Sequence, residues 1–440
     1  MSTLDASPWA GGAWRWFPTP DRRLLLLSIA LQLALAPLFG HAYDTRLFMA
    51  TGYLVGTGQN PYVAQDLSAV FDRASFALRS TVGYLPPWPL VLGLLYLGVH
   101  AVVRSLLVYN LALKLPVIAA TVGLAYLVAA VLQNLGAPPA TCRRAWVFLL
   151  FNPLLLYFGA VWGQIDAIVA LLSLSALVLV WAGRSRSSAV VLALAVCFKP
   201  IALPLLLVAL AFAWRESLRR AIGYAAFFAG GALLFGVVPF VVLGWSPSPI
   251  LDRWNAHFTM SGTLSYMTVL RLVRDPFELT GHWWLLGLVW IPALAICTLA
   301  LRRGDGGFAD LLKKSTAVVL VFYLTRTWLS ESNLILILPL VLILTSMGEL
   351  DRRALSVIWI LPLVFTVVGS TPLQLLFPAF PEAMDEALDY TARWYDAAVV
   401  VRAALVIAWQ VAGWWIVVAC LRRGPARVPL GENVAQAVAR

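Results

Sequence analysis

The sequence has 440 residues, of which 61% are hydrophobic and 12% are charged. An average soluble domain is roughly 45–50% apolar and 25% charged, so this composition excludes a soluble globular protein. The formal net charge of +11 comes mostly from arginines that stand between apolar runs. Charges in such positions set membrane topology, so we do not expect nucleic acid as a partner.

The four cysteines lie in or beside apolar runs and form no CxxC pair: Cys142, Cys197, Cys297 and Cys420. They therefore predict neither a zinc site nor a disulfide framework.

The first apolar run, 24–40, follows a cytoplasmic N-terminal segment over 1–23 that ends in Arg22 and Arg23. Small residues on either side of His41 resemble a signal-peptidase site, but the length of the run favours an uncleaved first span.

Residues 41–111 are predicted to form a large loop on the outer side. Periodicity predicts helices over 45–56 and 66–80, separated by a turn cluster at 56–61. Their apolar faces favour helices that lie on the membrane surface. We interpret the run 86–103 as an interfacial or re-entrant element on the outer side.

Basic residues decide the topology of the remaining runs, because short cytoplasmic loops are rich in Lys and Arg. With the N-terminus inside and 188–214 read as a short hairpin broken at Lys199-Pro200, every cationic cluster falls inside. The rival topology, in which 86–103 and 188–214 each cross once, places four arginines outside. Broken helices are tolerated where they line a cavity, so the break indicates a site. The candidate spans are 24–40, 86–103, 112–135, 145–162, 166–182, 188–214, 221–243, 283–300, 315–329, 334–348, 354–374 and 398–420.

The predicted fold class is an all-α polytopic membrane protein with about twelve transmembrane helices. Residues 24–243 form a seven-span module that includes the first outer loop, and 244–282 form a second outer loop. Further C-terminal transmembrane helices occupy 283–420, and a cytoplasmic tail occupies 421–440.

Acidic residues are scarce, so those at the outer ends of spans are the first candidates for chemistry. Asp44 follows the first span, where it is either a catalytic carboxylate or the N-cap of the helix over 45–56. Gln164 and Asp166 lie in an outer turn, where Asp166 either contributes to a site or caps the next helix.

Four further charged or titratable positions accompany these residues. An unpaired lysine near hydrocarbon is costly, so a bound anion is one explanation for Lys199. Arg326 and Glu331 flank an outer turn, as either a structural ion pair or substrate contacts. His257 lies in the second outer loop, where a lone histidine is usually solvated.

No nucleotide motif accompanies this group, since the sequence has neither a P-loop nor a GxGxxG after a strand. A reaction at the outer leaflet has no cytosolic nucleotide supply. An activated donor would therefore come from the lipid itself, and a lipid-phosphate donor fits.

Several short motifs resemble, in order and spacing, the GT-C glycosyltransferases that use polyprenyl- or dolichyl-phosphate sugars. The similarity is closest to mannosyltransferases of the GPI-anchor first-mannose type and their prokaryotic relatives. The motifs are Tyr43-Asp44, Gly58-x-Asn60-Pro61-Tyr62, Tyr84-Leu85-Pro86-Pro87, Lys114-Leu115-Pro116, Asn152-Pro153, Trp162-Gly163-Gln164-x-Asp166, Phe198-Lys199-Pro200 and Ser330-Glu331-Ser332-Asn333 before Pro339.

The resemblance implies a GT-C fold with Asp44 as the catalytic base of an inverting hexosyl transfer, with mannose favoured. Lys199, Arg326 and His257 are the candidates for binding the donor phosphate. Many relatives carry a DxD motif where this chain has Asp44-Thr45-Arg46, so we expect no metal cofactor. The candidate substrate-binding residues are Gln164, Asp166, Glu331, Tyr43 and Arg46.

The expected partners are a polyprenyl-phosphate sugar, a lipid-linked or glycolipid acceptor and the bilayer. We expect a monomer in a prokaryotic plasma membrane, with its active site on the extracytoplasmic face. The alternative is a transporter or flippase coupled through Asp166, Lys199 and Glu331, and a noncatalytic subunit is a third reading. The transporter predicts repeated halves with corresponding broken helices, whereas the sequence shows one such break.

Overall fold

The computed structural model describes residues 21–63, 80–252, 262–270, 281–301, 306–369, 372–384, 386, 389–390 and 393–422. The chain is an all-α membrane protein: within these ranges nearly every element is helical, and the strands are two residues long. Many large apolar side chains point outward, including Val241, Ile296 and Val411, which are 75%, 70% and 68% exposed. Such exposure suits helices surrounded by lipid.

Five helical segments among the described residues are long and apolar enough to cross a membrane. They coincide with predicted spans: Leu106–Asn134, Pro139–Trp162, Leu218–Val242, Arg352–Gly369 and Ala397–Leu421. Their elements are α5 (Leu106–Asn134), α6 (Pro139–Leu150) continued by α7 (Pro153–Leu156) and η3 (Tyr157–Trp162), α11 (Leu218–Gly236) continued by α12 (Val238–Val242), α18 (Arg352–Gly369) and α20 (Tyr395–Leu421).

The other apolar helices are shorter or carry more charge. A helix of 14 residues, such as α1, extends about 21 Å, less than the hydrocarbon core of roughly 30 Å. Helix length alone therefore supports five of the twelve predicted spans. These helices are α1 (Arg22–Leu35), α4 (Pro87–Leu95) with η2 (Tyr96–His100), α8 (Asp166–Trp181), α9 (Ser185–Phe198), α10 (Pro204–Glu216), η5 (Gly281–Leu288), α15 (Trp290–Leu301), α16 (Phe308–Thr325), η6 (Glu331–Leu336) and α17 (Leu338–Ser346).

The break predicted within 188–214 is confirmed. Helix α9 ends at Phe198 because Lys199 is extended, with φ −156° and ψ 119°, as expected for a residue that precedes proline. The short helix η4 (Pro200–Ala202) follows, and α10 begins at Pro204. Both α9 and α10 pack against α11.

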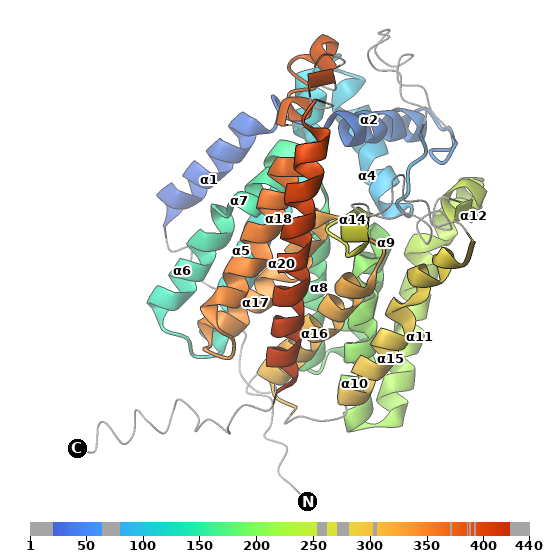
Figure 1. Ribbon diagram of the computed structural model, residues 1–440. Helices are drawn as coiled ribbons and strands as arrows, with labels where there is room; N and C mark the ends of the chain where they lie inside the picture. Colours follow the sequence, from blue (N-terminus) through green and yellow to red (C-terminus); the bar gives the residue numbers. More distant parts are fainter. Residues whose placement is uncertain are drawn as a thin grey trace, which may run out of the picture.

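The first outer loop begins with helix α2 (Ala42–Gly56), which confirms the helix predicted over 45–56. Figure 1 shows α2 lying across one end of the bundle, nearly perpendicular to α5 and α20. Helix α2 packs on α4. The predicted run 86–103 is helical from Pro87 to His100. Of the helix predicted over 66–80, residues 66–79 lie outside the described residues.

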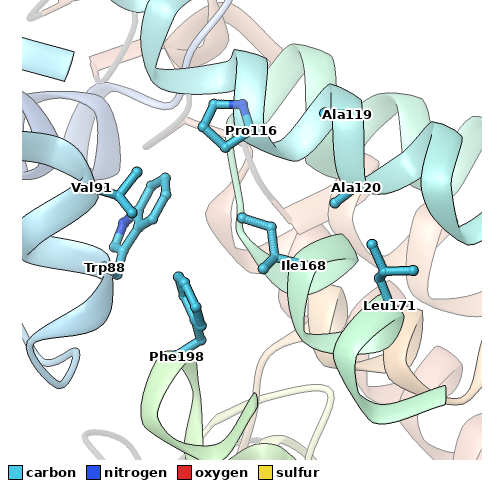
Figure 2. A pocket seen from close by; sticks show the side chains of 8 residues that line it. All are labelled: Trp88, Val91, Pro116, Ala119, Ala120, Ile168, Leu171 and Phe198. Carbon is cyan, nitrogen blue, oxygen red and sulfur yellow. The ribbon is translucent and has the colours of Figure 1, made fainter. Parts of the chain in front are cut away.

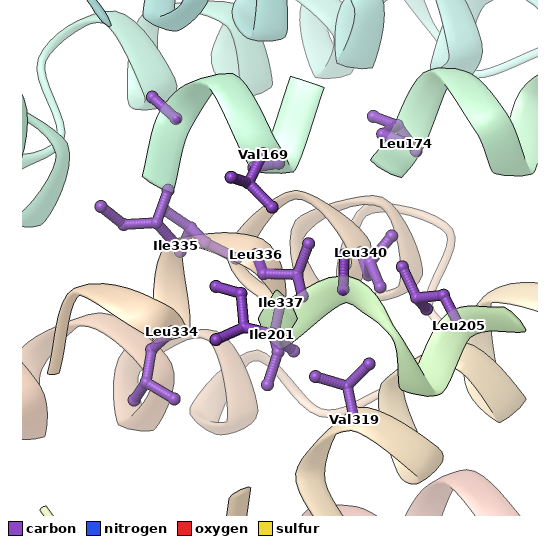
Figure 3. Packing of buried hydrophobic residues seen from close by; sticks show 14 of the residues in the cluster. Val169, Leu174, Ile201, Leu205, Val319, Leu334, Ile335, Leu336, Ile337 and Leu340 are labelled. Carbon is purple, nitrogen blue, oxygen red and sulfur yellow. The ribbon is translucent and has the colours of Figure 1, made fainter. Parts of the chain in front are cut away.

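The centre of the bundle is built from apolar helices that other helices surround. Nearly every residue of α16 is buried, and all but the last residue of α17 are too. A helix that is apolar on all sides belongs in such an interior. Figure 3 shows Val169 of α8, Leu205 of α10, Val319 of α16 and Leu340 of α17 packed together there.

Short elements join segments that lie far apart in the sequence. Strand β1 (Gly262–Thr263) pairs in parallel with β2 (Trp328–Leu329), so the loop predicted over 244–282 contacts the turn after α16. Gly40 pairs with Leu376, in the segment that holds η7 (Pro372–Leu375) and η8 (Pro381–Ala383). The remaining short helix is α14 (Met267–Leu270).

Candidate functional site

Asp44 lies in the first turn of α2 and accepts two hydrogen bonds from a distant segment. Trp162 Nε1 and Gln164 Nε2 donate to Asp44 Oδ2 over 2.7 and 2.8 Å. The other carboxylate oxygen, Oδ1, accepts no hydrogen bond from a described residue. The Asp44 side chain is 17% exposed. One oxygen is therefore held, and the other is left for a further partner.

A glycine turn brings the two donors to the same carboxylate. Helix η3 ends at Trp162, and Gly163 follows with φ +97°, a conformation that glycine adopts without strain. Tyr84 donates to Gln164 Oε1 over 3.4 Å. The amide is thereby oriented with its nitrogen toward Asp44.

His41 packs on the other side of this cluster. Its ring stacks on the Trp162 indole with centroids 4.1 Å apart, and its Nδ1 lies 3.5 Å from Asp44 Oδ2. Burial lowers the pKa of His41, more than the nearby Asp44 carboxylate raises it. The imidazole is therefore neutral at pH 7. In addition, no described Lys or Arg forms an ion pair with Asp44.

Neither aspartate is a helix cap, which corrects the simpler interpretation of both positions. Helix α2 begins at Ala42 with His41 as its N-cap, so Asp44 lies inside the first turn. Helix α8 begins at Asp166 itself, with Ile165 as its N-cap. Both carboxylates are free of capping bonds and point to other partners.

A second polar cluster forms where α9 is broken. Lys199 Nζ donates to both carboxylate oxygens of Asp166 at 2.8 Å and lies 3.4 Å from Ser332 Oγ. Asp166 is fully buried, and the Lys199 side chain is 13% exposed. Lys199 is thus paired with a carboxylate, so its position near hydrocarbon does not require the bound anion that the sequence offered as one explanation.

Arg326 is the C-cap of α16, and Glu331 is the first residue of η6. They form no ion pair with each other within the part of the chain that the structure describes. Glu331 is buried and interacts electrostatically with Lys199 and with Arg402 of α20. The Arg326 guanidinium lies 5.1 Å from the centroid of the Phe322 ring, and no described carboxylate pairs with it. Arg326 is therefore a better candidate than Lys199 for binding an anion.

Tyr43 and Arg46 flank Asp44 on α2 but turn to protein partners. The Tyr43 hydroxyl is 2.6 Å from Ser80 Oγ. Arg46 donates from Nε to the carbonyl of Ala42 and lies over the Phe377 ring. His257 lies outside the described residues.

An apolar groove of about 350 Å³ lies between α4, α5, α8 and α9. Figure 2 shows Trp88, Pro116 and Phe198 facing this space. Phe198 precedes Lys199 in the chain, and Ile168, which also lines the groove, is two residues after Asp166. Two of the lining residues are therefore close in sequence to the second polar cluster, although neither Lys199 nor Asp166 lines the groove itself.

Sequence reasoning did not predict several members of the site. His41, Tyr84, Ser332 and Arg402 were assigned no role. Arg402 could have been noticed as an arginine within the apolar run 398–420. The other three give no signal in the sequence beyond their place in or beside the motifs.

No group of three or more His, Cys, Asp or Glu side chains that could hold a metal ion occurs among the described residues. Metal independence stays a prediction of the sequence. No protein-family model matches the chain, and a search of curated proteins finds no match.

Proposed function

We propose that this protein is an inverting glycosyltransferase of the GT-C type. It would move a hexose from a polyprenyl-phosphate carrier to a lipid-linked or glycolipid acceptor on the extracytoplasmic face of the plasma membrane. The observation that carries the proposal is Asp44, a partly exposed carboxylate with one oxygen held by Trp162 and Gln164 and the other not bonded to any described residue. The resemblance of the motifs favours mannose as the sugar.

In this reaction Asp44 Oδ1 takes the proton of an acceptor hydroxyl while that oxygen attacks the anomeric carbon. The new glycosidic bond forms as the bond from that carbon to the phosphate oxygen breaks. The lipid phosphate leaves with the electron pair of that bond. One carboxylate is enough, because inversion needs no covalent intermediate on the protein.

The departing phosphate needs positive charge nearby. Arg326 is half-buried and has no acidic partner among the described residues, so its charge is available. Lys199 is already balanced by Asp166, and we assign it a weaker electrostatic role. Asp166 would hold Lys199 in place, and Glu331 would orient a sugar hydroxyl or these cations.

The groove beside Phe198 and Lys199 supports a lipid substrate. Its walls are apolar and aromatic, and its lining residue Phe198 directly precedes Lys199, a member of the second cluster. A prenyl chain with a phosphate at one end has the same arrangement of apolar and charged parts.

The test is sugar transfer by the purified protein in nanodiscs. Radiolabelled polyprenyl-phosphate-mannose and polyprenyl-phosphate-glucose are offered with a lipid extract as acceptor. Wild type transfers one sugar, and Asp44→Asn lowers kcat by about 1000-fold while it still binds the donor.

The matched control is Asp351→Asn, because Asp351 caps α18 by accepting from the Arg353 amide and lies outside the site. Its rate should equal that of wild type. A fully active Asp44→Asn would exclude Asp44 as the base. Movement of donor lipid across the bilayer without transfer would favour a flippase.

A further inference from the structure

Lys114 is a buried lysine that the proposed reaction does not use. It lies within α5 and is 2% exposed. Its Nζ donates to the carbonyls of Ala36, Ala160 and Val161 over 3.0, 2.9 and 3.0 Å, and to that of Phe39. A lysine ammonium group has three N–H donors, and when backbone carbonyls accept all of them none is left to bind a substrate.

These four carbonyls belong to two chain segments that lead into the site. Ala36 and Phe39 follow the end of α1 and precede the helix that carries Asp44. Ala160 and Val161 lie in η3 and precede Trp162 and Gln164. Carbonyls at a helix end lack partners within the helix, so Lys114 supplies the donors that both ends need.

Asn110, one turn earlier on α5, contacts only the first of these segments. Its Nδ2 donates to the carbonyls of Ala36, Pro37 and Phe39 over 2.6, 3.0 and 2.7 Å. Lys114 is therefore the residue of this pair that bonds both segments, whereas Asn110 supports one of them.

Gly163 shows that the second segment is shaped around the lysine. A Cβ atom at Gly163 would lie 3.2 Å from Lys114 Cε and 3.7 Å from Cγ. The turn that carries Trp162 and Gln164 thus rests directly on the lysine side chain. The two segments also meet above it, where the His41 amide donates to the Trp162 carbonyl over 3.4 Å.

We propose that Lys114 is a positioning residue that sets the distance between Asp44 and its two donors, Trp162 and Gln164. Its effect on the rate rests on the proposed function, whereas its effect on the geometry does not. A catalytic group displaced by about 1 Å can lose roughly 100-fold in rate, so a fixed separation of the segments has a measurable consequence.

The first test reads the geometry without any substrate. The protein is labelled with 5-fluorotryptophan, and the ¹⁹F signal of Trp162 is assigned by its loss in Trp162→Phe. Asp44→Asn should shift this signal, because it changes the acceptor of the indole N–H. Lys114→Met, which keeps the length of the side chain but has no donors, should shift or broaden it as well.

The matched control is Lys314→Met. Lys314 is also buried, at 6% exposure, but it pairs with Asp310 over 2.7 Å at the start of α16. The Lys314→Met variant should leave the ¹⁹F signal of Trp162 unchanged. Lys114→Gln, which keeps two N–H donors, serves if Lys114→Met does not fold. An unchanged Trp162 signal in a folded Lys114 variant would overturn the proposal.

The second test uses the rate of sugar transfer. Lys114→Met should lower kcat by about 100-fold with little change in the KM for the donor, and Asn110→Leu should lower it less. In a Gln164→Leu background the further loss should be much smaller than 100-fold, because part of the positioned contact is already gone.

A role in stability alone would give equal losses in both backgrounds, and that result would count against positioning. If the wild type transfers no sugar, the proposed function fails, but the fluorine experiment still tests the role of Lys114.

Discussion

The two carboxylates of the site, Asp44 and Asp166, have opposite surroundings although their segments adjoin. Asp44 is partly exposed and bonded to neutral donors, an indole and an amide. Asp166 is fully buried, and both of its oxygens bond to Lys199. A carboxylate held by neutral donors keeps an oxygen that can take a proton, whereas a buried ion pair is a structural link. The comparison favours Asp44 over Asp166 as the base of the proposed reaction and indicates that Asp166 supports the broken helix.

The largest expected difference between the two carboxylates is in their contribution to the free energy of unfolding. Asp166→Asn should lower the free energy of unfolding by about 3–5 kcal/mol, because it leaves the Lys199 charge buried and unpaired. Asp44→Asn should cost about 1 kcal/mol, since only one hydrogen-bonded oxygen changes character. Thermal and denaturant unfolding in detergent would measure both. The double variant Asp166→Asn/Lys199→Met should recover part of the loss, and equal losses for the two single variants would remove the contrast.

Arg326 sharpens the comparison, because it is the cation without an acidic partner among the described residues. Arg326→Gln should raise the KM for the polyprenyl-phosphate donor by about 10- to 100-fold, as expected for a lost charge-assisted hydrogen bond. Arg353→Gln, at the start of α18, is the control and should have no effect. If Lys199→Gln impaired donor binding at normal stability and Arg326→Gln did not, the assignment of the phosphate site would be reversed.

The groove gives a smaller effect that depends on the donor lipid. Ala119 is exposed and lines the groove, so Ala119→Phe should narrow it without disturbing the core. We expect the KM for long-chain donors to rise about fivefold, with short-chain analogues unaffected. Ala226→Phe, exposed on α11 outside the groove, is the control. An equal change for long and short chains would place the prenyl chain elsewhere.

The smallest effect concerns pH. Burial lowers the pKa of His41 in the folded state below the ordinary value of 6.5. The unfolded chain therefore binds a proton more readily, and stability should fall as the pH drops below 6.5. His41→Phe, which keeps an aromatic ring against Trp162, should reduce the difference in melting temperature between pH 7.5 and pH 5. An undiminished difference would mean that other groups cause it.

Local features of the structure could be predicted from the sequence, because their causes are local. Proline after Lys199 prevents α9 from continuing, and hydrophobic periodicity predicts α2. The sequence left open whether Asp44 caps its helix; it does not, because α2 begins three residues earlier than its apolar pattern indicates, with His41 rather than Asp44 as the N-cap.

Contacts between distant segments could not be predicted in this way. Asp44 and Trp162 are 118 residues apart, and Asp166 and Lys199 are 33 apart. Periodicity and loop charge place each of these residues near the outer ends of helices, but they do not say which carboxylate meets which donor. Lys114 illustrates the limit, since its sequence motif gives no sign that it binds four carbonyls of two other segments.

The separation of Asp44 from Trp162 also matters during biosynthesis. At roughly 5–20 residues per second, the ribosome completes Trp162 about 6 to 24 s after Asp44. Until then the first helix and α2 have no partner for the carboxylate, and the carbonyls after α1 lack part of their bonding. The nascent chain therefore exposes these groups to a chaperone or the insertion machinery for that interval, and the end of the bundle that holds α2 can close only after the helices up to η3 have been inserted.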